Sequence, residues 1–482
     1  MTPSLDIELG AVKVVPKSIL NVWDLPNLQE ELTFRAHFTK DYGFGKKEPV
    51  CLLREHDDCI WLPRHFDTSR WPVSVRDATV AGSPVSLGFR LDRQARQPSK
   101  QRFQDGLIQS YLEAIGQQPP NRQGGLICAP CGSGKTVLAL KLADTIGRTL
   151  LVVVHKTFLV NQWRRLIQEY TSVKDDEVGI VRQAKCEWEG KKIVIALIQS
   201  LCSREYPDDF YRWAGHVMID EVHRLPGPRW CDASMLFPAA LRTGLTATPK
   251  RKDGMHKALD LTIGPILAQG VSYGVMPKVF QTKGRVHISA RAYRPYERQP
   301  DGSRALSETR MYLARFLSLL IRQDNRNSWL VGEMLKACQE RRKIFILSDR
   351  REHLDVLKGG FDASCRGQFS SGFYIGGMKA AELEESEKAD AIFGTYAMAS
   401  EALDIPAMDT LFLTTPRTAV EQAVGRILRD HDGKRTPLVV DVVDDVPFCL
   451  TWAKKRLKEY RRLGYTVCKS VDDKEGVTSG SR

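Results

Sequence analysis

The sequence predicts an α/β protein with two parallel-sheet units in tandem and a small strand-rich N-terminal accessory domain. Short apolar runs alternate with amphipathic segments over residues 96–275, and the same alternation returns over residues 305–470. Apolar runs of this length are typical of strands that are buried on both faces, and intervening helices connect such strands in parallel. We therefore expect each unit to carry helices on both faces of one sheet.

Each unit has its own set of expected strands. In the first unit they are GGLICA (124–129), TLLVVVH (149–155), KKIVIALIQS (191–200) and HVMID (216–220). In the second they are KIFILS (343–348), DAIFGTY (390–396), TLFLTT (410–415) and PLVVDVV (437–443). Helices are expected over 137–147 and 158–170, where apolar residues recur at helical spacing.

The remaining segments are predicted from their composition. Residues 1–95 mix short apolar runs with Pro and Gly, which predicts the accessory domain, a candidate for nucleic-acid binding. Residues 276–304 hold many Pro and Gly residues and are expected to form a linker. Residues 471–482 are expected to be a disordered tail.

Composition limits the classes of protein that fit. Lys and Arg exceed Asp and Glu, giving a net charge of +13 over 482 residues, which favours a polyanionic partner. Eleven cysteines without a repeated spacing argue against a secreted disulfide framework. No apolar run approaches the roughly 20 residues that cross a bilayer. We expect a soluble, intracellular protein with no membrane partner.

The stretch CAPCGSGKT (128–136) follows an expected strand and precedes an expected helix. This is the setting of a phosphate-binding loop, in which glycines let backbone N–H groups converge on phosphate oxygens. Ala129 stands where the common pattern has its first Gly. A zinc site at Cys128 and Cys131 would need two more ligands, and the other nine cysteines form no second C-x-x-C. Packing of small residues is the better explanation for this pair.

Two carboxylates complete the expected nucleotide site. Lys135 would reach the outer phosphates of ATP, and Thr136 would offer a hydroxyl to Mg²⁺. In HVMIDEVHRL (216–225), Asp220 and Glu221 end an apolar strand. One carboxylate can hold Mg²⁺ through water while its neighbour polarises the attacking water. An acidic surface turn is the alternative for this pair.

Seven motifs in order resemble those of superfamily 2 helicases. In the first unit they are APCGSGKT (129–136), VVVHKTFLVNQW (152–163), DEVH (220–223) and LTATP (245–249); in the second, KIFILSDRREHL (343–354), GTYAMASEALDIP (394–406) and EQAVGRILR (421–429). The phrases VHKTFLVNQW, YIGGMKAAELEESEKADAIFGTYAMASEALDIP and TPRTAVEQAVGRILR are similar to the XPB-like branch, especially to helicases of nucleocytoplasmic large DNA viruses. These include the poxvirus transcript-release helicase and its iridovirus and asfarvirus relatives. The resemblance implies that both sheet units are RecA-like.

The motifs and the resemblance together assign residues to roles. The residues expected to bind the nucleotide are Gln104, Gly132, Ser133, Gly134, Lys135, Thr136 and Asp404, and Gln104 is a candidate for recognising adenine. Catalysis falls to Lys135, Asp220, Glu221, Gln422, Arg426 and Arg429, the two arginines acting as fingers on the γ-phosphate. Coupling to the bound strand falls to His223, Thr246 and Thr248. Nucleic-acid contacts fall to Lys156, Arg350 and Thr395, and Mg²⁺ to Thr136 and Asp220.

The resemblance implies an ATP- and Mg²⁺-dependent DNA helicase or translocase. We expect movement 3′ to 5′, and a role in viral transcription termination or in DNA repair and recombination. DNA is the favoured partner over RNA, transcription or replication machinery are further candidate partners, and an infected host cell or virion is the expected location. An RNA helicase and a nucleic-acid clamp without unwinding activity remain alternatives.

Overall fold

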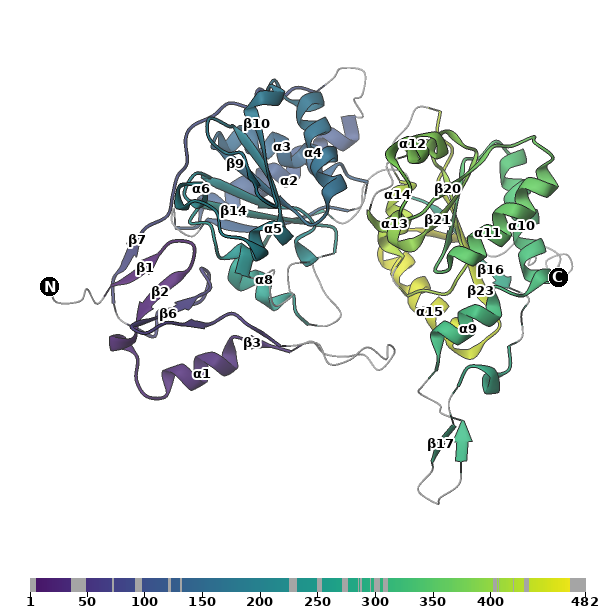
Figure 1. Cartoon of the computed structure of the whole chain (residues 1–482), viewed down its shortest axis with the longest axis horizontal. Coiled ribbons are helices and arrows are strands. Elements are labelled where there is room, and N and C mark those ends of the chain that lie inside the picture. Colours follow the sequence, from purple (N-terminus) through teal and green to yellow (C-terminus); the bar gives the residue numbers. More distant parts are fainter. Residues whose placement is uncertain are drawn as a thin grey trace, which may run out of the picture. The chain divides into compact units, whose positions relative to one another are not determined.

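A computed structural model of the chain has two compact units, residues 1–271 and 272–482 (Figure 1). The structure describes residues 6–35, 49–71, 73–91, 98–119, 123–130, 132–224, 232–248, 254–270, 276–284, 286, 288–294, 296–298, 304–306, 311–401, 405, 407–418, 420–428 and 433–468. Within this part of the chain no helix is both long and apolar enough to span a bilayer. The predicted tail, 471–482, lies outside the described residues.

The first unit is built on an eight-stranded sheet with the order β11-β10-β12-β9-β13-β14-β8-β15, parallel except at β11. Its strands are β8 (Gly124–Cys128), β9 (Leu150–Val154), β10 (Val178–Arg182), β11 (Lys185–Cys186), β12 (Ile193–Leu197), β13 (His216–Ile219), β14 (Leu241–Thr246) and β15 (Ile266–Gln269). Its helices are α2 (Pro98–Gly116), α3 (Lys135–Ile146), α4 (Thr157–Tyr170), α5 (Ile198–Ser203), α6 (Asp208–Tyr211) and α8 (Lys257–Thr262). The strands and helices predicted for this unit are confirmed.

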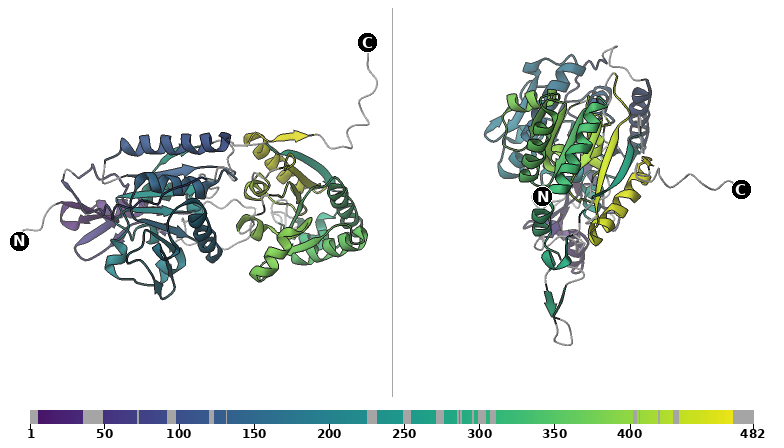
Figure 2. Two further views of the ribbon diagram at one scale, coloured as in Figure 1. Left: turned by 90° about the horizontal axis from the view of Figure 1, so that it is seen from above. Right: turned by 90° about the vertical axis from the view of Figure 1, so that its right-hand side faces the viewer.

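Two cores cover the two faces of this sheet. Along β8, Ile127 packs with residues of α2, α3 and α4, whereas Leu126 and Cys128 pack with residues of α5, α6 and α8. This alternation follows from the two-residue period of a strand, which turns successive side chains to opposite faces. Figure 2 shows α2 as a long helix along one side of the unit, and it packs against β15 and β8.

The second unit is built on a seven-stranded parallel sheet with the order β20-β21-β19-β22-β23-β16-β24. Its strands are β16 (Lys278–Gly284), β19 (Ile344–Ser348), β20 (Ser371–Tyr374), β21 (Ala391–Thr395), β22 (Thr410–Leu413), β23 (Leu438–Asp444) and β24 (Thr466–Cys468). Its helices are α9 (Leu313–Leu320), α10 (Asp324–Gln339), α11 (Arg351–Cys365), α12 (Ala380–Lys388), α13 (Tyr396–Glu401), α14 (Glu421–Arg426) and α15 (Pro447–Arg462). A short antiparallel pair, β17 (Tyr296–Arg298) and β18 (Arg304–Leu306), precedes α9. All four strands predicted here are confirmed.

The predicted linker over 276–304 is wrong at its beginning. Residues Lys278–Gly284 form β16, which pairs in parallel with β23 on one side and β24 on the other. The segment KVFQTKG is polar at four of its seven positions, so it lacks the apolar run by which the other strands are found. Its partners lie more than 150 positions later in the chain, and only the folded sheet shows that it is a strand.

A five-stranded sheet precedes the first unit's large sheet and is packed onto it. Its order is β5-β6-β2-β1-β7, formed by β1 (Ile7–Leu9), β2 (Lys13–Pro16), β5 (Arg54–Glu55), β6 (Cys59–Leu62) and β7 (Val75–Asp77). Helix α1 (Asp24–Glu31) and the pair β3 (Thr33–Phe34) and β4 (Val50–Cys51) complete this part. Its core is shared with Met255 and with Ala258 of α8. The accessory domain is therefore part of the first unit, where it shares a core with α8, rather than a separately tethered domain.

Two buried arginines hold this junction together. Arg64 donates to the carbonyl oxygens of Ala239 and Ala240, and Arg242, which is 1% exposed, donates to those of Ala11, Phe237 and Thr262. Burial and the nearby Arg64 charge lower the pKa of Arg242. Each guanidinium offers five donors in a fixed plane, so one side chain can satisfy several carbonyls that would otherwise be buried without partners.

The segment that leaves the accessory domain runs along the first unit before α2 begins. Val80 forms a bridge with Ala239, and the Asp144 carboxylate of α3 accepts the backbone N–H groups of Leu87, Gly88 and Phe89 at 2.8, 3.1 and 3.1 Å. Residues 80–89 therefore pack against α3 and the segment before β14, although the sequence predicts that they belong to the accessory domain, which it ends at residue 95.

Replacing Arg242 with Ala tests the junction. We expect the free energy of unfolding to fall by about 3 kcal/mol, because three buried carbonyls lose a charged donor. Chemical denaturation measures this loss. Arg76→Ala, which removes an exposed ion pair with Glu8, is the control and should change stability little. Equal effects of the two variants would contradict the role of Arg242.

Candidate nucleotide-binding site

The phosphate loop joins β8 to α3 and has the backbone geometry that anion binding requires. Gly132 and Gly134 have φ angles of 82° and 76°, in the left-handed region that favours glycine. Ser133 between them is buried, and its hydroxyl donates to Pro130 O at 2.7 Å. Lys135 is the first residue of α3, whose N-terminal N–H groups have no partner within the helix. The loop can therefore present backbone donors to a phosphate group.

The small residues before the loop are part of the core. Ala129 is 1% exposed, and its backbone N–H donates to Thr246 O at 2.9 Å. A methyl group is therefore accommodated where the common pattern has glycine. Cys128 is also buried, and burial raises the pKa of its thiol to about 12. Cys128 belongs to the hydrophobic core beside β8, in keeping with packing, and Cys131 lies outside the described residues.

Gln104 of α2 contacts the phosphate loop directly. Its side-chain amide Nε2 donates to Ser133 O at 2.8 Å and to Gly134 O at 3.3 Å, and the side chain is 6% exposed. A Cβ atom on Gly134 would lie 2.7 Å from the same nitrogen. The amide nitrogen thus braces the loop. The sequence offered no sign of this brace, since a glutamine on an amphipathic helix is usually exposed.

The two acidic residues follow β13, which is separated from β8 in the sheet by β14 alone. Lys135 Nζ lies 3.9 Å from Glu221 Oε1, so the two sequence motifs meet at one edge of the sheet. Glu221 has a φ of 51°, a left-handed conformation that is uncommon outside glycine and recurs at functional sites. The two adjacent carboxylates have different partners: Glu221 lies beside Lys135 and His223, and Asp220 accepts a hydrogen bond from Trp163.

Asp220 lies in a protected environment. Burial and the Glu221 charge raise its pKa to about 6, while a hydrogen bond from Trp163 and the Lys135 charge oppose that rise. The Trp163 indole nitrogen donates to Asp220 Oδ2 at 3.0 Å. Trp163 was part of a recognised motif, but the sequence assigned it no role.

The three residues predicted to couple the nucleotide to the bound strand form a chain of contacts. His223 Nδ1 lies 3.3 Å from Glu221 Oε2 and 3.0 Å from Thr246 Oγ1, and Thr246 Oγ1 accepts the backbone N–H of Thr248 at 3.0 Å. Thr246 is the last residue of β14 and is fully buried. The side chains of the second and third helicase motifs are therefore in direct contact.

The arrangement suits Mg²⁺ bound together with a nucleotide. Among the described residues, no group of three His, Cys, Asp or Glu side chains could hold a metal ion alone. Mg²⁺ commonly keeps several waters and takes one or two protein oxygens plus phosphate oxygens. Thr136 at the start of α3 and Asp220 after β13 supply one hydroxyl and one carboxylate, which fits this requirement.

The residues predicted to contact nucleic acid also lie at or just after the carboxyl ends of β-strands. Lys156 follows β9 and precedes α4. In the second unit, Arg350 precedes α11 and donates to Ala314 O at 3.1 Å, and Thr395 ends β21, where its hydroxyl accepts the Met398 N–H at 3.4 Å. Each of the two second-unit residues is half-buried, and their role as strand contacts stays a prediction.

The predicted γ-phosphate residues of the second unit lie in or after α14. Arg426 Nε donates to Ala399 O of α13 at 2.8 Å, so this helix end is tied to the segment that follows β21. Gln422 belongs to α14, but its side chain is not described. Asp404 and Arg429 lie outside the described residues.

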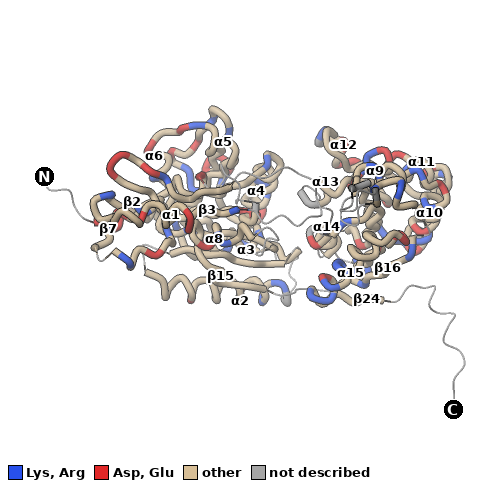
Figure 3. The backbone as a smooth tube through the Cα atoms, turned by 90° about the horizontal axis from the view of Figure 1, so that it is seen from below, with Lys and Arg blue, Asp and Glu red and all other residues tan. Residues whose placement is uncertain are grey.

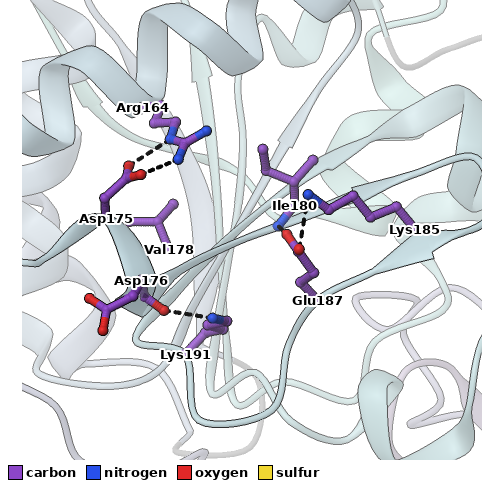
Figure 4. Close-up of a pocket in the computed structure, with 8 residues that line it drawn as sticks. All are labelled: Arg164, Asp175, Asp176, Val178, Ile180, Lys185, Glu187 and Lys191. Carbon is purple, nitrogen blue, oxygen red and sulfur yellow. Dashed lines mark hydrogen bonds and ion pairs between the residues drawn. The ribbon is translucent and has the colours of Figure 1, made fainter.

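A separate pocket on the first unit is not a candidate for the nucleotide. It has a volume of about 480 Å³ and opens beside β10, which four strands separate from β8 in the sheet (Figure 4). Its charged groups contact one another: Arg164 pairs with Asp175, Lys185 pairs with Glu187, and Lys191 donates to Asp176 O. The charged side chains that line this pocket are thus largely paired with other lining residues.

Comparisons with known proteins support the assignment of the motifs. Residues 98–251 match the family model described as "Type III restriction enzyme, res subunit". The chain is 27% identical over 478 residues to "Putative ATP-dependent RNA helicase L396" of Acanthamoeba polyphaga mimivirus, covering 95% of this chain and 85% of that protein. It is 32% identical over 143 residues to "DNA 3'-5' translocase XPB2" of Sulfurisphaera tokodaii, but these residues cover only 30% of this chain and 31% of that protein.

Solved structures share the fold. A fragment of an HsdR subunit of a type I restriction enzyme from Vibrio vulnificus matches with a TM-score of 0.52 and 15% identity, over 80% of this chain and 69% of that chain. The structure of Mss116p bound to ssRNA matches with a TM-score of 0.51 and 12% identity, over 83% of each chain. At these identities the likeness shows the fold alone.

The fold and the motifs define an enzyme class, that of the superfamily 2 helicases with tandem RecA-like units, whose members are nucleic-acid-dependent ATPases. Within that superfamily the chain is similar to XPB-like helicases and to viral helicases. The predicted resemblance is confirmed at this level.

Gln104→Ala separates the two roles open to this glutamine. If the side chain braces the loop, losing two hydrogen bonds should weaken ATP and GTP binding alike, by about 10-fold. If it reads adenine, the variant should lose its preference for ATP over GTP. Equilibrium binding of both nucleotides decides between them, with Gln109→Ala on the exposed face of α2 as the matched control.

Proposed function

We propose that the chain is an ATP-dependent DNA translocase that moves 3′ to 5′ and separates strands. The observation that supports it most directly is the contact of Lys135, Glu221, His223 and Thr246 at one edge of the first sheet. These contacts connect Lys135, the proposed phosphate-binding residue, with Thr246, the last residue of β14. Preference for DNA and the direction of travel rest on the XPB relatives, which are named DNA 3′-5′ translocases or helicases.

The chemistry proposed for this site divides between its residues. The loop and Lys135 hold the phosphates, while Thr136 and Asp220 hold Mg²⁺, which would neutralise charge on the phosphate oxygens. Glu221 polarises the attacking water. Arg426 and Arg429 stabilise charge on the transferred phosphoryl group, a role worth about 10³- to 10⁵-fold in rate in other phosphoryl-transfer enzymes. Asp404 and Gln422 are proposed contacts of the ribose and the γ-phosphate.

Nucleic-acid binding in this proposal depends on phosphate contacts. Lys156, Arg350 and Thr395 are proposed to contact the strand. The net charge of +13 supports a polyanionic partner. Helix α15, parts of whose tube are blue in Figure 3, carries five exposed cationic residues: Lys454, Lys455, Lys458, Arg461 and Arg462. Such contacts make binding independent of sequence and weaker as salt rises.

An RNA helicase is the second candidate function. The mimivirus relative that carries RNA helicase in its name matches over 95% of the chain, a much longer match than that of the XPB relatives. A clamp that binds without turnover is disfavoured by the contact between Lys135 and Glu221, a pair that serves hydrolysis.

We further propose a role in viral transcription termination, or in DNA repair or recombination, inside an infected cell.

Lys135→Ala tests the ATPase. The wild-type protein should hydrolyse ATP faster when single-stranded polynucleotide is added, and the variant should lose at least about 99% of that activity, because the outer phosphates lose their cation. Lys141→Ala is the matched control on the same helix, since Lys141 pairs with Asp105 of α2. A fully active Lys135→Ala, or a wild-type protein without any stimulation, would refute the proposed enzyme. Binding of polynucleotide by the wild-type protein without any ATP turnover would support the clamp, whereas a Glu221→Gln variant with unchanged turnover would contradict the role proposed for Glu221.

Strand displacement on overhang substrates tests partner and direction. Duplexes with a 3′ or a 5′ overhang, each made in DNA and in RNA, should be opened fastest when the tail is 3′ DNA. Faster opening of RNA duplexes would favour the second candidate function. Hydrolysis without displacement on any substrate would show tracking along the strand rather than separation.

A further inference from the structure

Trp163 occupies a position that packing alone does not explain. Its side chain is 1% exposed and belongs to the core between α3, α4 and the sheet. A buried indole N–H usually finds an acceptor, and a backbone carbonyl would serve. Here the acceptor is Asp220 Oδ2, at 3.0 Å, in the residue next to Glu221, the proposed catalytic carboxylate.

In the hydrogen bond between Trp163 and Asp220, the indole can only donate and the carboxylate accepts. Indole is a donor only, so Trp163 cannot compete with Asp220 as a metal ligand. A hydrogen bond to an ionised carboxylate is stronger than one between neutral groups. With Oδ2 held by the indole, rotation of the carboxylate is restricted, and Oδ1 has a defined direction.

Asp220 and Trp163 both lie on or next to well-packed elements of the first unit. Asp220 follows β13, whose neighbours β9 and β14 fix it from both sides, and the Asp220 N–H donates to Val153 O of β9 at 3.0 Å. Trp163 lies on α4, which packs against β9, β12 and α3. Neither group can turn away without disturbing a buried core, so the hydrogen bond is preorganised.

We propose that Trp163 is a positioning residue whose indole N–H holds the Asp220 carboxylate in the orientation that binds the Mg²⁺–nucleotide complex. This inference rests on the proposed function of the site and names a residue that acts through Asp220. Side chains that orient a metal-binding carboxylate typically contribute 10- to 100-fold to metal affinity.

Trp163→Phe removes the N–H and keeps a large aromatic ring. Binding of mant-ADP, a fluorescent nucleotide, is measured while Mg²⁺ is titrated. The Mg²⁺ concentration for half-maximal enhancement of binding should rise by about 10-fold or more. Binding in EDTA should stay unchanged, because the phosphate loop does not depend on the indole. Trp213→Phe, at the opposite end of β13 from Asp220, is the control and should behave as wild type.

The outcomes distinguish the inference from the function on which it rests. A wild-type Mg²⁺ dependence in Trp163→Phe overturns the positioning role and leaves the proposed function standing. A wild-type protein that shows no Mg²⁺-dependent nucleotide binding contradicts both. Equal loss of binding with and without Mg²⁺ in Trp163→Phe also overturns the inference, since it indicates a general loss of structure.

A second measurement needs no change at Trp163. The chain has nine tryptophans, and ¹⁵N labelling of their indoles gives one signal for each. Asp220→Asn should shift one indole signal, because the acceptor loses its charge, and Mg²⁺ with ADP should shift the same signal in the wild-type protein. If no indole signal responds to Asp220→Asn, the hydrogen bond is absent in solution and the proposal fails.

Discussion

The parallel pairing of four neighbouring strands is the constraint on which the site depends. Strands β8, β14, β13 and β9 lie side by side, so their carboxyl ends share one edge of the sheet. The phosphate loop, Thr246, Asp220 and Lys156 each follow or end one of these strands. Residues that are more than 100 positions apart in the chain thus meet because backbone hydrogen bonds align the strands that carry them.

Polar contacts then fix the directions of the side chains at this edge. Gln104 donates to the carbonyls of the loop, and Trp163 donates to Asp220. Thr246 Oγ1 contacts His223 Nδ1 and accepts the Thr248 N–H. Glu221, in a left-handed backbone conformation, lies beside Lys135 and His223. Because these donors and acceptors are largely buried, each lost partner leaves an unpaired polar group, and the geometry resists change.

The second unit organises its own motifs through buried charge. Asp349, which follows β19, pairs with Arg417 at 2.7 Å, and the Arg417 guanidinium stands 4.5 Å from the Tyr396 ring centre. Arg326 and Arg456 are each almost fully buried and pair with Asp444 and Asp441 of β23. The segments after β19, β21 and β22 are thereby tied to one another.

The sequence by itself determined the two α/β units, the phosphate loop and the order of the helicase motifs, because these are local: an apolar run makes a strand, and a glycine-rich turn before a helix makes an anion site. It also predicted Lys135, Asp220 and Glu221 as site residues by residue type and position. Only the tertiary structure decided that Lys278–Gly284 is a strand, that residues 80–89 pack with the first unit, and that Gln104 and Trp163 contact the loop and Asp220. Each of these depends on a partner distant in the chain, and no local pattern of residues specifies such a partner.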